Sequence, residues 1–183
     1  DKKIPHALIG AMALSIYGLP RFTADIDLIA HEEHRRAISE IMRKLGYDCF
    51  ENTDMFAHFD SELGVYGTVD FMFVATAQGR AIIERAVAVC DDVIGTAAVV
   101  QPTDYAVLKL MAMANDADRK AFDIADLSTL FKAVAAGLIN PVFDPLDTDL
   151  LRKYASRFNV LGELESLMPM PRRDSAPEAG GNG

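Results

Sequence analysis

Acidic side chains in one short segment carry the clearest chemical signal. Asp25 and Asp27 are separated by one residue in a segment where polar and apolar residues alternate. This pattern predicts a strand over residues 22–30. Side chains two positions apart in a strand share a face, and a spacing of about 6.6 Å lets both carboxylates reach one ion. Thr23 shares their face. The other face is expected to belong to the core and carries Phe22, Ala24, Ile26, Leu28 and Ala30.

A third acid, Asp70, interrupts residues 65–74, which are apolar on both faces and predict an interior strand. A lone carboxylate there is costly to bury unless it is paired or bound to a metal. If Asp70 lies beside Asp25 and Asp27, each like-charged pair costs on the order of 3 kcal/mol at about 5 Å and an effective dielectric of about 20. A divalent cation would offset this repulsion, and carboxylate ligands without a nearby cysteine favour Mg²⁺ or Mn²⁺ over zinc.

Such a site favours phosphoryl or nucleotidyl transfer. Mg²⁺ held by a few carboxylates usually completes its shell with water and substrate phosphates, and a pair of ions can activate the attacking oxygen and stabilise the leaving oxygen. A simpler role stays open for each part. The Asp25–Asp27 pair alone could be a solvated strand face, and Asp70 alone a strand-end acid that reaches water. Their conjunction in two different strands favours a site.

The elements that must position these acids alternate between helix and strand up to residue 101 and are mostly helical afterwards. Helices are predicted at residues 5–17, 31–45, 77–87, 102–115, 120–136, 147–158 and 160–168, and strands at 22–30, 47–51, 55–60, 65–74, 88–94 and 97–101. The strand pairs 55–60 with 65–74, and 88–94 with 97–101, are expected to form hairpins. This order predicts an α+β fold with a small mixed sheet flanked by helices and a helical C-terminal part.

Three segments are expected along the chain. Residues 1–101 would form the core, residues 102–168 a helical subdomain and residues 169–183 a disordered tail rich in Pro, Gly, Ala and charge. A formal charge of −9 argues against non-specific DNA binding, although a local basic pocket could still bind RNA or nucleotides. Cys49 and Cys90 are too few for a disulfide scaffold or a multi-cysteine zinc site. With no long apolar run and no leader peptide visible, a soluble cytoplasmic protein with no membrane partner is expected.

The segment around the acidic pair also resembles a known family. Residues 10–28 resemble the nucleotidyltransferase fold of the DNA polymerase beta superfamily, and more narrowly the AbiEii-type nucleotidyltransferase toxins of bacteria. The matching positions are Gly10, Gly18, Arg21, Thr23, Asp25 and Asp27, with Asp70 as the third acid. Ala11 stands where the family usually has Gly or Ser, so a hydroxyl contact to phosphate is lost.

The resemblance continues to about residue 136. Residues 102–112 look like the family's lysine-bearing helix, with Lys109 as the lysine, and Arg119, Asp123 and Asp126 look like its later Arg and Asp-x-x-Asp motif. Phe122 replaces the lysine usual before the first of these acids, and Lys120 is the candidate to stand in for it.

The resemblance implies a metal-dependent enzyme that moves a nucleoside monophosphate from an NTP to an acceptor hydroxyl. Asp25, Asp27 and Asp70 would hold Mg²⁺ or Mn²⁺, and Asp70 could instead take the acceptor's proton. The nucleotide site would include Gly10, Ala11, Arg21, Thr23 and Asp123. Lys109 would neutralise phosphates or pair with Asp123.

The acceptor implied by the resemblance is an RNA 3′ end, with tRNA first, or a protein side chain. The setting implied is a toxin–antitoxin or phage-defence system with a cognate partner. Single residues could also have purely structural roles: helix packing for Gly10, a surface salt bridge for Arg21 and a snorkelling lysine for Lys109. Two rival functions also stay open, an inactive module that binds a nucleotide or partner, and an antitoxin that nucleotidylates a partner toxin.

Overall fold

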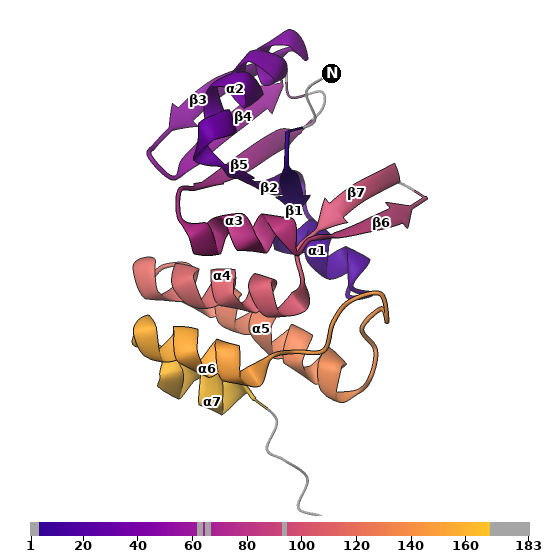
Figure 1. Ribbon diagram of the computed structural model, residues 1–183, viewed down its shortest axis with the longest axis vertical. Coiled ribbons are helices and arrows are strands. Elements are labelled where there is room, and N and C mark those ends of the chain that lie inside the picture. The colour runs from indigo at the N-terminus through magenta and orange to yellow at the C-terminus, as the bar shows by residue number, and fades with distance from the viewer. Residues whose placement is uncertain (1–3, 62–63, 65–66, 93–94, 169–183) are drawn as a thin grey trace, which may run out of the picture.

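One mixed seven-stranded sheet, in the order β3-β4-β5-β2-β1-β7-β6, organises the molecule (Figure 1). The computed structural model describes residues 4–61, 64, 67–92 and 95–168. The strands are β1 (His6–Leu8), β2 (Asp25–His31), β3 (Tyr47–Asn52), β4 (Phe56–Ser61), β5 (Thr68–Val74), β6 (Val87–Asp91) and β7 (Gly95–Val99). The helices are α1 (Gly10–Ile16), η1 (Glu32–His34), α2 (Arg35–Lys44), α3 (Ala77–Glu84), α4 (Pro102–Asn115), α5 (Lys120–Ala135), α6 (Thr148–Arg157) and α7 (Leu161–Leu167).

The pairing of strands confirms both predicted hairpins. β4 pairs antiparallel with β5, and β6 pairs antiparallel with β7. β5 lies between β4 and β2, as expected for a strand that is apolar on both faces, and its pairing with β2 is parallel. The α+β class with a helical C-terminal part is confirmed. The predicted disordered tail at residues 169–183 lies outside the described residues.

The predicted helix over residues 5–17 is wrong in its first part. His6–Leu8 form β1, which pairs with β2 and β7, and the helix begins only at Gly10. Ala7 and Leu8 are buried within the sheet. A short run of apolar residues has no periodicity that separates a buried strand from a helix, so the sequence pattern alone could not find the break.

The expected burial of Phe22 is also wrong, because its side chain is 93% exposed. β2 begins at Asp25 rather than at residue 22, and Thr23 lies in the irregular segment before it, where its hydroxyl accepts a hydrogen bond from the Asp25 N–H at 3.2 Å. The polar–apolar alternation therefore extends three residues beyond the strand, into a segment that the sheet does not bury.

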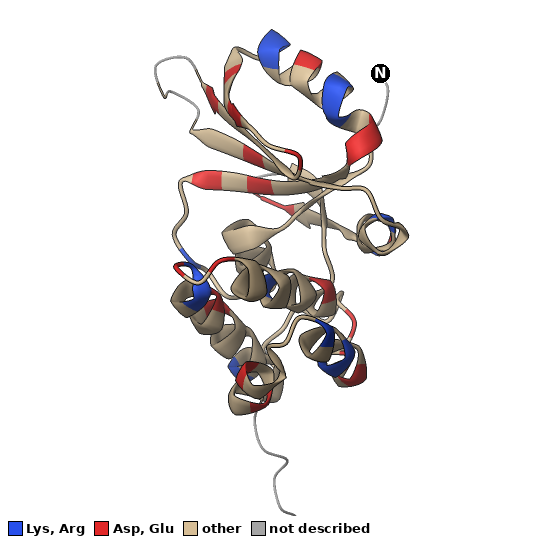
Figure 2. Ribbon diagram, turned by 90° about the vertical axis from the view of Figure 1, so that its left-hand side faces the viewer, with Lys and Arg blue, Asp and Glu red and all other residues tan. Residues whose placement is uncertain are grey.

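The two faces of the sheet have different neighbours. On one face, α2 packs Ile38 and Met42 in a cluster with Phe59 and Phe71. On the other face, α1, α3 and the layer of α4 to α7 cover the sheet (Figure 1). Asp25 and Asp27 alternate with residues of the α2 face, so they point away from α2 toward this helical layer. Acidic positions on the strands accordingly lie above the helical layer in Figure 2.

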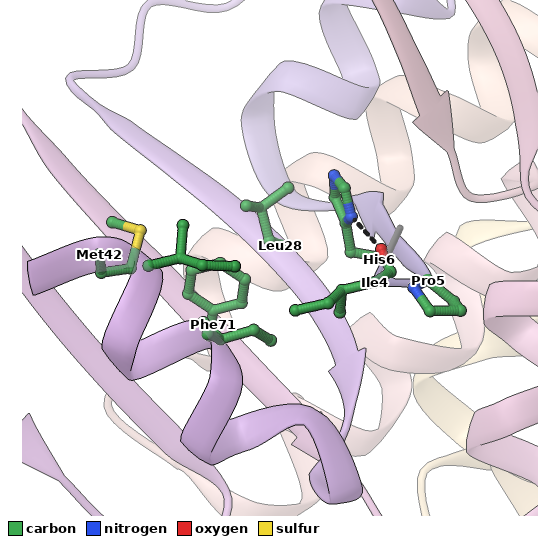
Figure 3. A pocket seen from close by; sticks show the side chains of 8 residues that line it. Ile4, Pro5, His6, Leu28, Met42 and Phe71 are labelled. Carbon is green, nitrogen blue, oxygen red and sulfur yellow. Dashed lines mark hydrogen bonds between the residues drawn. The ribbon is translucent and has the colours of Figure 1, made fainter. Parts of the chain in front are cut away.

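An apolar groove of about 460 Å³ lies on the α2 face, away from the acids. It runs between α2 and the segment that leads into β1, and its lining includes Ile4, Leu28, Met42 and Phe71 (Figure 3). His6 is its most polar residue, and its ring nitrogen is satisfied by the Ile4 carbonyl at 2.8 Å. The groove thus lacks the charged groups that the chemistry discussed above requires.

None of the helices in the described part of the chain is long and apolar enough to cross a membrane.

Candidate active site

A row of carboxylates lies where the two central strands pair in parallel. In the β2–β5 register, Asp27 lies opposite Asp70, and Asp25 lies opposite Thr68. Side chains at paired positions of neighbouring strands share a face, so Asp70 lies on the same face as Asp25 and Asp27. The alternation predicted the shared face of Asp25 and Asp27, and the register adds Asp70 to it. The Thr68 hydroxyl donates a short hydrogen bond to the Asp25 carboxylate.

Asp27 is the most perturbed acid of the row. Burial raises its pKa above the ordinary value for aspartate, and the charge of Asp70, with a smaller contribution from Asp25, raises it further. The charges of Lys109 and Arg119 oppose this rise. Asp27 therefore lies at the point where acids of the sheet meet cations of the helical layer.

Glycine at position 10 allows α1 to approach Asp27. Gly10 begins α1 with φ at +61°, and a Cβ atom added there would lie 1.9 Å from the Asp27 Oδ2. The Ile9 N–H donates to the Asp27 carbonyl at 3.0 Å, which fixes the start of the helix against β2. Ala11 is buried beside Gly10 and also lines the cavity below.

Replacing Gly10 with alanine is expected to displace the Asp27 carboxylate and to lower the activity of a site built on that carboxylate by at least about tenfold. The left-handed backbone adds about 1–2 kcal/mol of strain. Gly46→Ala is the matched control, because Gly46 has φ at +85° but nothing within 4 Å of the added Cβ. Thermal unfolding with an activity assay checks this. Both variants should lose stability, and equal activity in the two would contradict a specific role for Gly10.

Lys109 of α4 joins the helical layer in a buried ion cluster. Its ammonium lies 2.8 Å from the Asp123 Oδ1 and 2.8 Å from the Asp126 Oδ2, and the three side chains are 14%, 1% and 6% exposed. Lys109 was expected either to neutralise phosphates or to pair with Asp123, and the structure shows the pairing. Arg21, half-exposed, extends the cluster through a 3.3 Å contact with Asp126. Burial and Asp126 raise the pKa of Tyr105, whose hydroxyl stays protonated and donates to Asp126 at 3.4 Å.

Arg119 is a cation of the site that forms no ion pair with the other described residues. Among the described residues its guanidinium has no ion-pair or hydrogen-bond partner, yet it lines the same cavity as Asp27 and lowers the pKa of that acid. Lys120, the candidate substitute for the family's lysine, points elsewhere and binds Glu163 of α7 at 2.6 Å. Of these two neighbouring cations, Arg119 is thus the one available to an anionic ligand.

A cavity of about 420 Å³ lies between Asp27 of the sheet and these cations. Its polar lining includes Gly10, Arg21, Asp27, Lys109, Arg119 and Asp123, but neither Asp25 nor Asp70. Thr23 is not part of this cavity. Together with Asp25 and Phe22 it lines a second hollow of about 390 Å³, and Arg21 lines both cavities.

The three carboxylates would need to rearrange to hold a divalent cation. Within the described ranges, no three His, Cys, Asp or Glu side chains lie close enough together to hold a metal as they stand. Asp25 is engaged by Thr68, and the Asp70 Oδ1 contacts the His58 ring at 2.8 Å. That contact lacks hydrogen-bond geometry, so the Asp70 Oδ1 is buried without a donor. An orphaned carboxylate oxygen beside two further carboxylates suits a hard cation, provided that Asp25 and Asp70 turn toward Asp27.

His58 is a residue that sequence reasoning missed. It lies on β4 directly opposite Asp70 in the antiparallel register, between the rings of Phe50 and Phe56 at 5.7 Å and 6.4 Å. The hairpin was predicted, but its register was not. Only the register places His58, rather than a neighbour, against the third acid.

Comparison with known proteins identifies the family. The family described as "Nucleotidyl transferase AbiEii toxin, Type IV TA system" matches residues 2–179. The chain belongs to the AbiEii nucleotidyltransferase toxin family. The match spans the sheet, the helical layer and both groups of charged residues described above, so the family resemblance of residues 6–136 is confirmed and extended.

Solved structures agree on the fold of this AbiEii-family chain. A solution structure of the antibiotic-resistance factor ANT(2'')-Ia is similar with a TM-score of 0.59 and 16% identity, covering 90% of this chain and 89% of that one. A crystal structure of ANT(2'')-Ia in complex with adenylyl-2''-tobramycin gives 0.59 and 15%, covering 86% and 90%. Such identities show a shared fold alone. The search of curated proteins gave no match.

The AbiEii-family protein is therefore a nucleotidyltransferase of type IV toxin–antitoxin systems. Membership implies an NTP substrate and an antitoxin partner. The predicted enzyme class and family setting are confirmed at this level, whereas the acceptor and the metal are not specified by it.

Proposed function

We propose that this chain transfers a nucleoside monophosphate from an NTP to an acceptor hydroxyl at the site formed by Asp25, Asp27 and Asp70. The observation that carries the proposal is the parallel register of β2 and β5, which sets Asp70 beside Asp27, the acid that lines the cavity. In the transfer, a bond forms between the acceptor oxygen and the α-phosphorus. The bond from that phosphorus to the bridging oxygen breaks, and pyrophosphate leaves.

The cations opposite the acids are suited to the triphosphate. Arg119 has no other described partner, and a guanidinium can bind phosphate oxygens through two parallel hydrogen bonds. Lys109 adds positive charge nearby, although Asp123 and Asp126 already hold it. Gly10 exposes backbone where a side chain would collide with Asp27.

Mg²⁺ or Mn²⁺, held by Asp25, Asp27 and Asp70, would supply charge neutralisation and activation of the attacking oxygen when bound. Asp70 is also placed to accept the proton of the acceptor hydroxyl, because one of its oxygens has no hydrogen-bond donor.

The proposed acceptor is an RNA 3′ end, with tRNA first, and a protein side chain is the second candidate. One observation favours the second. Next to Asp70, the same sheet face carries Asp48, Glu51 and Asp60 on β3 and β4, by their register with β5. This acidic strip repels a polyanion and suits a hydroxyl that lies among basic residues of a protein.

A label-transfer assay tests the function. The protein is incubated with each α-labelled NTP, Mg²⁺ or Mn²⁺ and a whole-cell extract, beside a variant carrying Asp25→Ala and Asp27→Ala. The expected result is a labelled macromolecule with the wild type and no label with the variant. Sensitivity of the label to RNase or protease then shows whether the acceptor is RNA or protein. NTP binding without any label would favour the inactive binding module. Label confined to one partner toxin would favour the antitoxin alternative.

We also propose a division of the chain into two units and a cellular location. The sheet core at residues 1–101 and the helical part at residues 102–168 are proposed as separate units that share the site, since the acids come from the first and Lys109 and Arg119 from the second. A reducing, cytoplasmic location is proposed because Cys49 and Cys90 are both free and exposed.

A further inference from the structure

We propose that Arg35 is a positioning residue of the NTP site, because it fixes the turn between β3 and β4 that supplies one wall of the cavity. Arg35 belongs to α2, on the opposite face of the sheet, and is not among the residues that line the cavity. The inference rests on the proposed function, because it takes this cavity as the NTP site.

Arg35 extends the sheet-facing side of α2. It precedes Ile38 and Met42 by three and seven residues, a spacing that places the three side chains on one side of the helix. Ile38 and Met42 are buried in the cluster that also contains Phe73. The Arg35 guanidinium lies over the Phe73 ring, with 4.0 Å between its Cζ and the ring centroid, where a cation is attracted to the ring face.

The N–H groups of this guanidinium reach the turn between β3 and β4. Its Nη1 donates to the Asn52 Oδ1 at 2.6 Å and to the Thr53 carbonyl at 2.9 Å, and its Nη2 donates to the Asp54 carbonyl at 2.5 Å. The next carbonyl, that of Met55, accepts from the Phe73 N–H at 2.7 Å. Three consecutive carbonyls of the turn therefore have donors, and these bonds fix the orientation of their peptide planes.

The turn presents its next side chains to the cavity. Met55 and Phe56 line the cavity beside Met72 of β5, and α4 contributes Leu108 and Met111. Met55 and Phe56 are 43% and 39% exposed, so packing against neighbouring side chains holds them only in part. The position of this wall thus depends on the backbone of the turn, and that backbone is held by Arg35.

A wall that is fixed in advance favours binding, because a ligand loses affinity for each side chain that it must order. Lysine is a poor substitute for Arg35, since one ammonium cannot lie flat on a ring and reach three acceptors together. Arg35 does not line the part of the cavity near Asp27 and Arg119. Its removal should therefore affect NTP binding and not turnover at saturating NTP.

Equilibrium binding of each α-labelled NTP in the presence of Mg²⁺, with urea denaturation of the same proteins, tests the proposal. Arg35→Met should weaken binding of the NTP that the wild type holds most tightly by on the order of tenfold. In the label-transfer assay it should raise KM for that NTP and leave kcat unchanged. Arg35→Lys should give an intermediate loss of affinity.

A background without the wall shows whether Arg35 acts through it. In a variant carrying Met55→Ala and Phe56→Ala, there is no large side chain left to position, so adding Arg35→Met should not weaken NTP binding further. Arg36→Met is the matched control. It removes the adjacent arginine of α2, whose side chain is 93% exposed and pairs with Glu40, and it should leave NTP binding unchanged.

The outcomes separate the two proposals. A folded Arg35→Met protein with wild-type NTP affinity would overturn the positioning role, and so would equal weakening by Arg35→Met with and without the wall. If Arg35→Met does not fold, Arg35→Lys decides between the same outcomes. Absence of NTP binding by the wild type would instead overturn the proposed function on which the inference rests.

Discussion

Asp27→Asn is expected to lower nucleotidyl transfer by at least about a thousandfold and to leave the fold at least as stable as the wild type. Asp27 faces Asp70 across β2 and β5 and lines the cavity, where it would bind the metal ion. Metal-based stabilisation of the transition state contributes several kcal/mol, and each 1.36 kcal/mol corresponds to about tenfold in rate. The label-transfer assay measures the loss.

The stability of this variant provides the internal check. The folded-state pKa of Asp27 is raised, so the folded protein disfavours its charged form. The penalty is absent at a pH below the unfolded-state pKa, and it grows as the pH rises through the folded-state pKa. Asparagine removes this penalty, so urea denaturation at neutral pH should show equal or higher stability.

The exposed acid Asp149 of α6, whose side chain is 96% exposed, gives the control Asp149→Asn, which should leave activity unchanged. A folded Asp27→Asn protein with wild-type transfer would exclude Asp27 from the site.

Lys109→Met is expected to lower the free energy of unfolding by about 3–5 kcal/mol, since it leaves Asp123 and Asp126 buried without their cation. For a chain of this size that loss corresponds to a fall in Tm of about 6–20 °C. Urea and thermal denaturation measure it. Arg21 does not substitute for the lysine, because it contacts only Asp126 and is itself half-exposed.

A triple variant separates the structural role of Lys109 from a role in transfer. Adding Asp123→Asn and Asp126→Asn to Lys109→Met neutralises the whole cluster and should restore most of the stability, because no unpaired charge stays buried. If the positive charge also helps to hold phosphate, the restored protein should still transfer label much more slowly than the wild type. Wild-type transfer in the stable triple variant would limit Lys109 to a structural role.

The parts of the site that sequence could predict were those with a local pattern. Alternation placed Asp25 and Asp27 on one face of a strand, and an apolar run predicted that Asp70 lies in an interior strand. Faces follow from a period of two within one strand. The opposition of Asp27 to Asp70, and of His58 to Asp70, depends on register between strands far apart in the chain, which no local period contains.

Predictions from local patterns were wrong where the backbone changes from one secondary structure to another. The boundary between β1 and α1 falls at Gly10, whose positive φ ends the strand, while the apolar residues continue across it. Phe22 continues the polar–apolar alternation into an irregular segment before β2, where its side chain is exposed. The double pairing of Lys109 required the packing of α4 on α5, so the sequence could offer that pairing only as one of two alternatives.

The division of charge between sheet and helical layer has a consequence for synthesis of the protein on the ribosome. The three acids all precede residue 71, whereas Lys109 and Arg119 emerge later, on or beside α4 and α5. A nascent chain that ends before residue 109 carries the repelling carboxylates without the two cations that face them. For a member of a toxin family, interrupted translation thus yields fragments without the two cations that the proposed function assigns to the triphosphate, and these cations are added only when the helical layer is made.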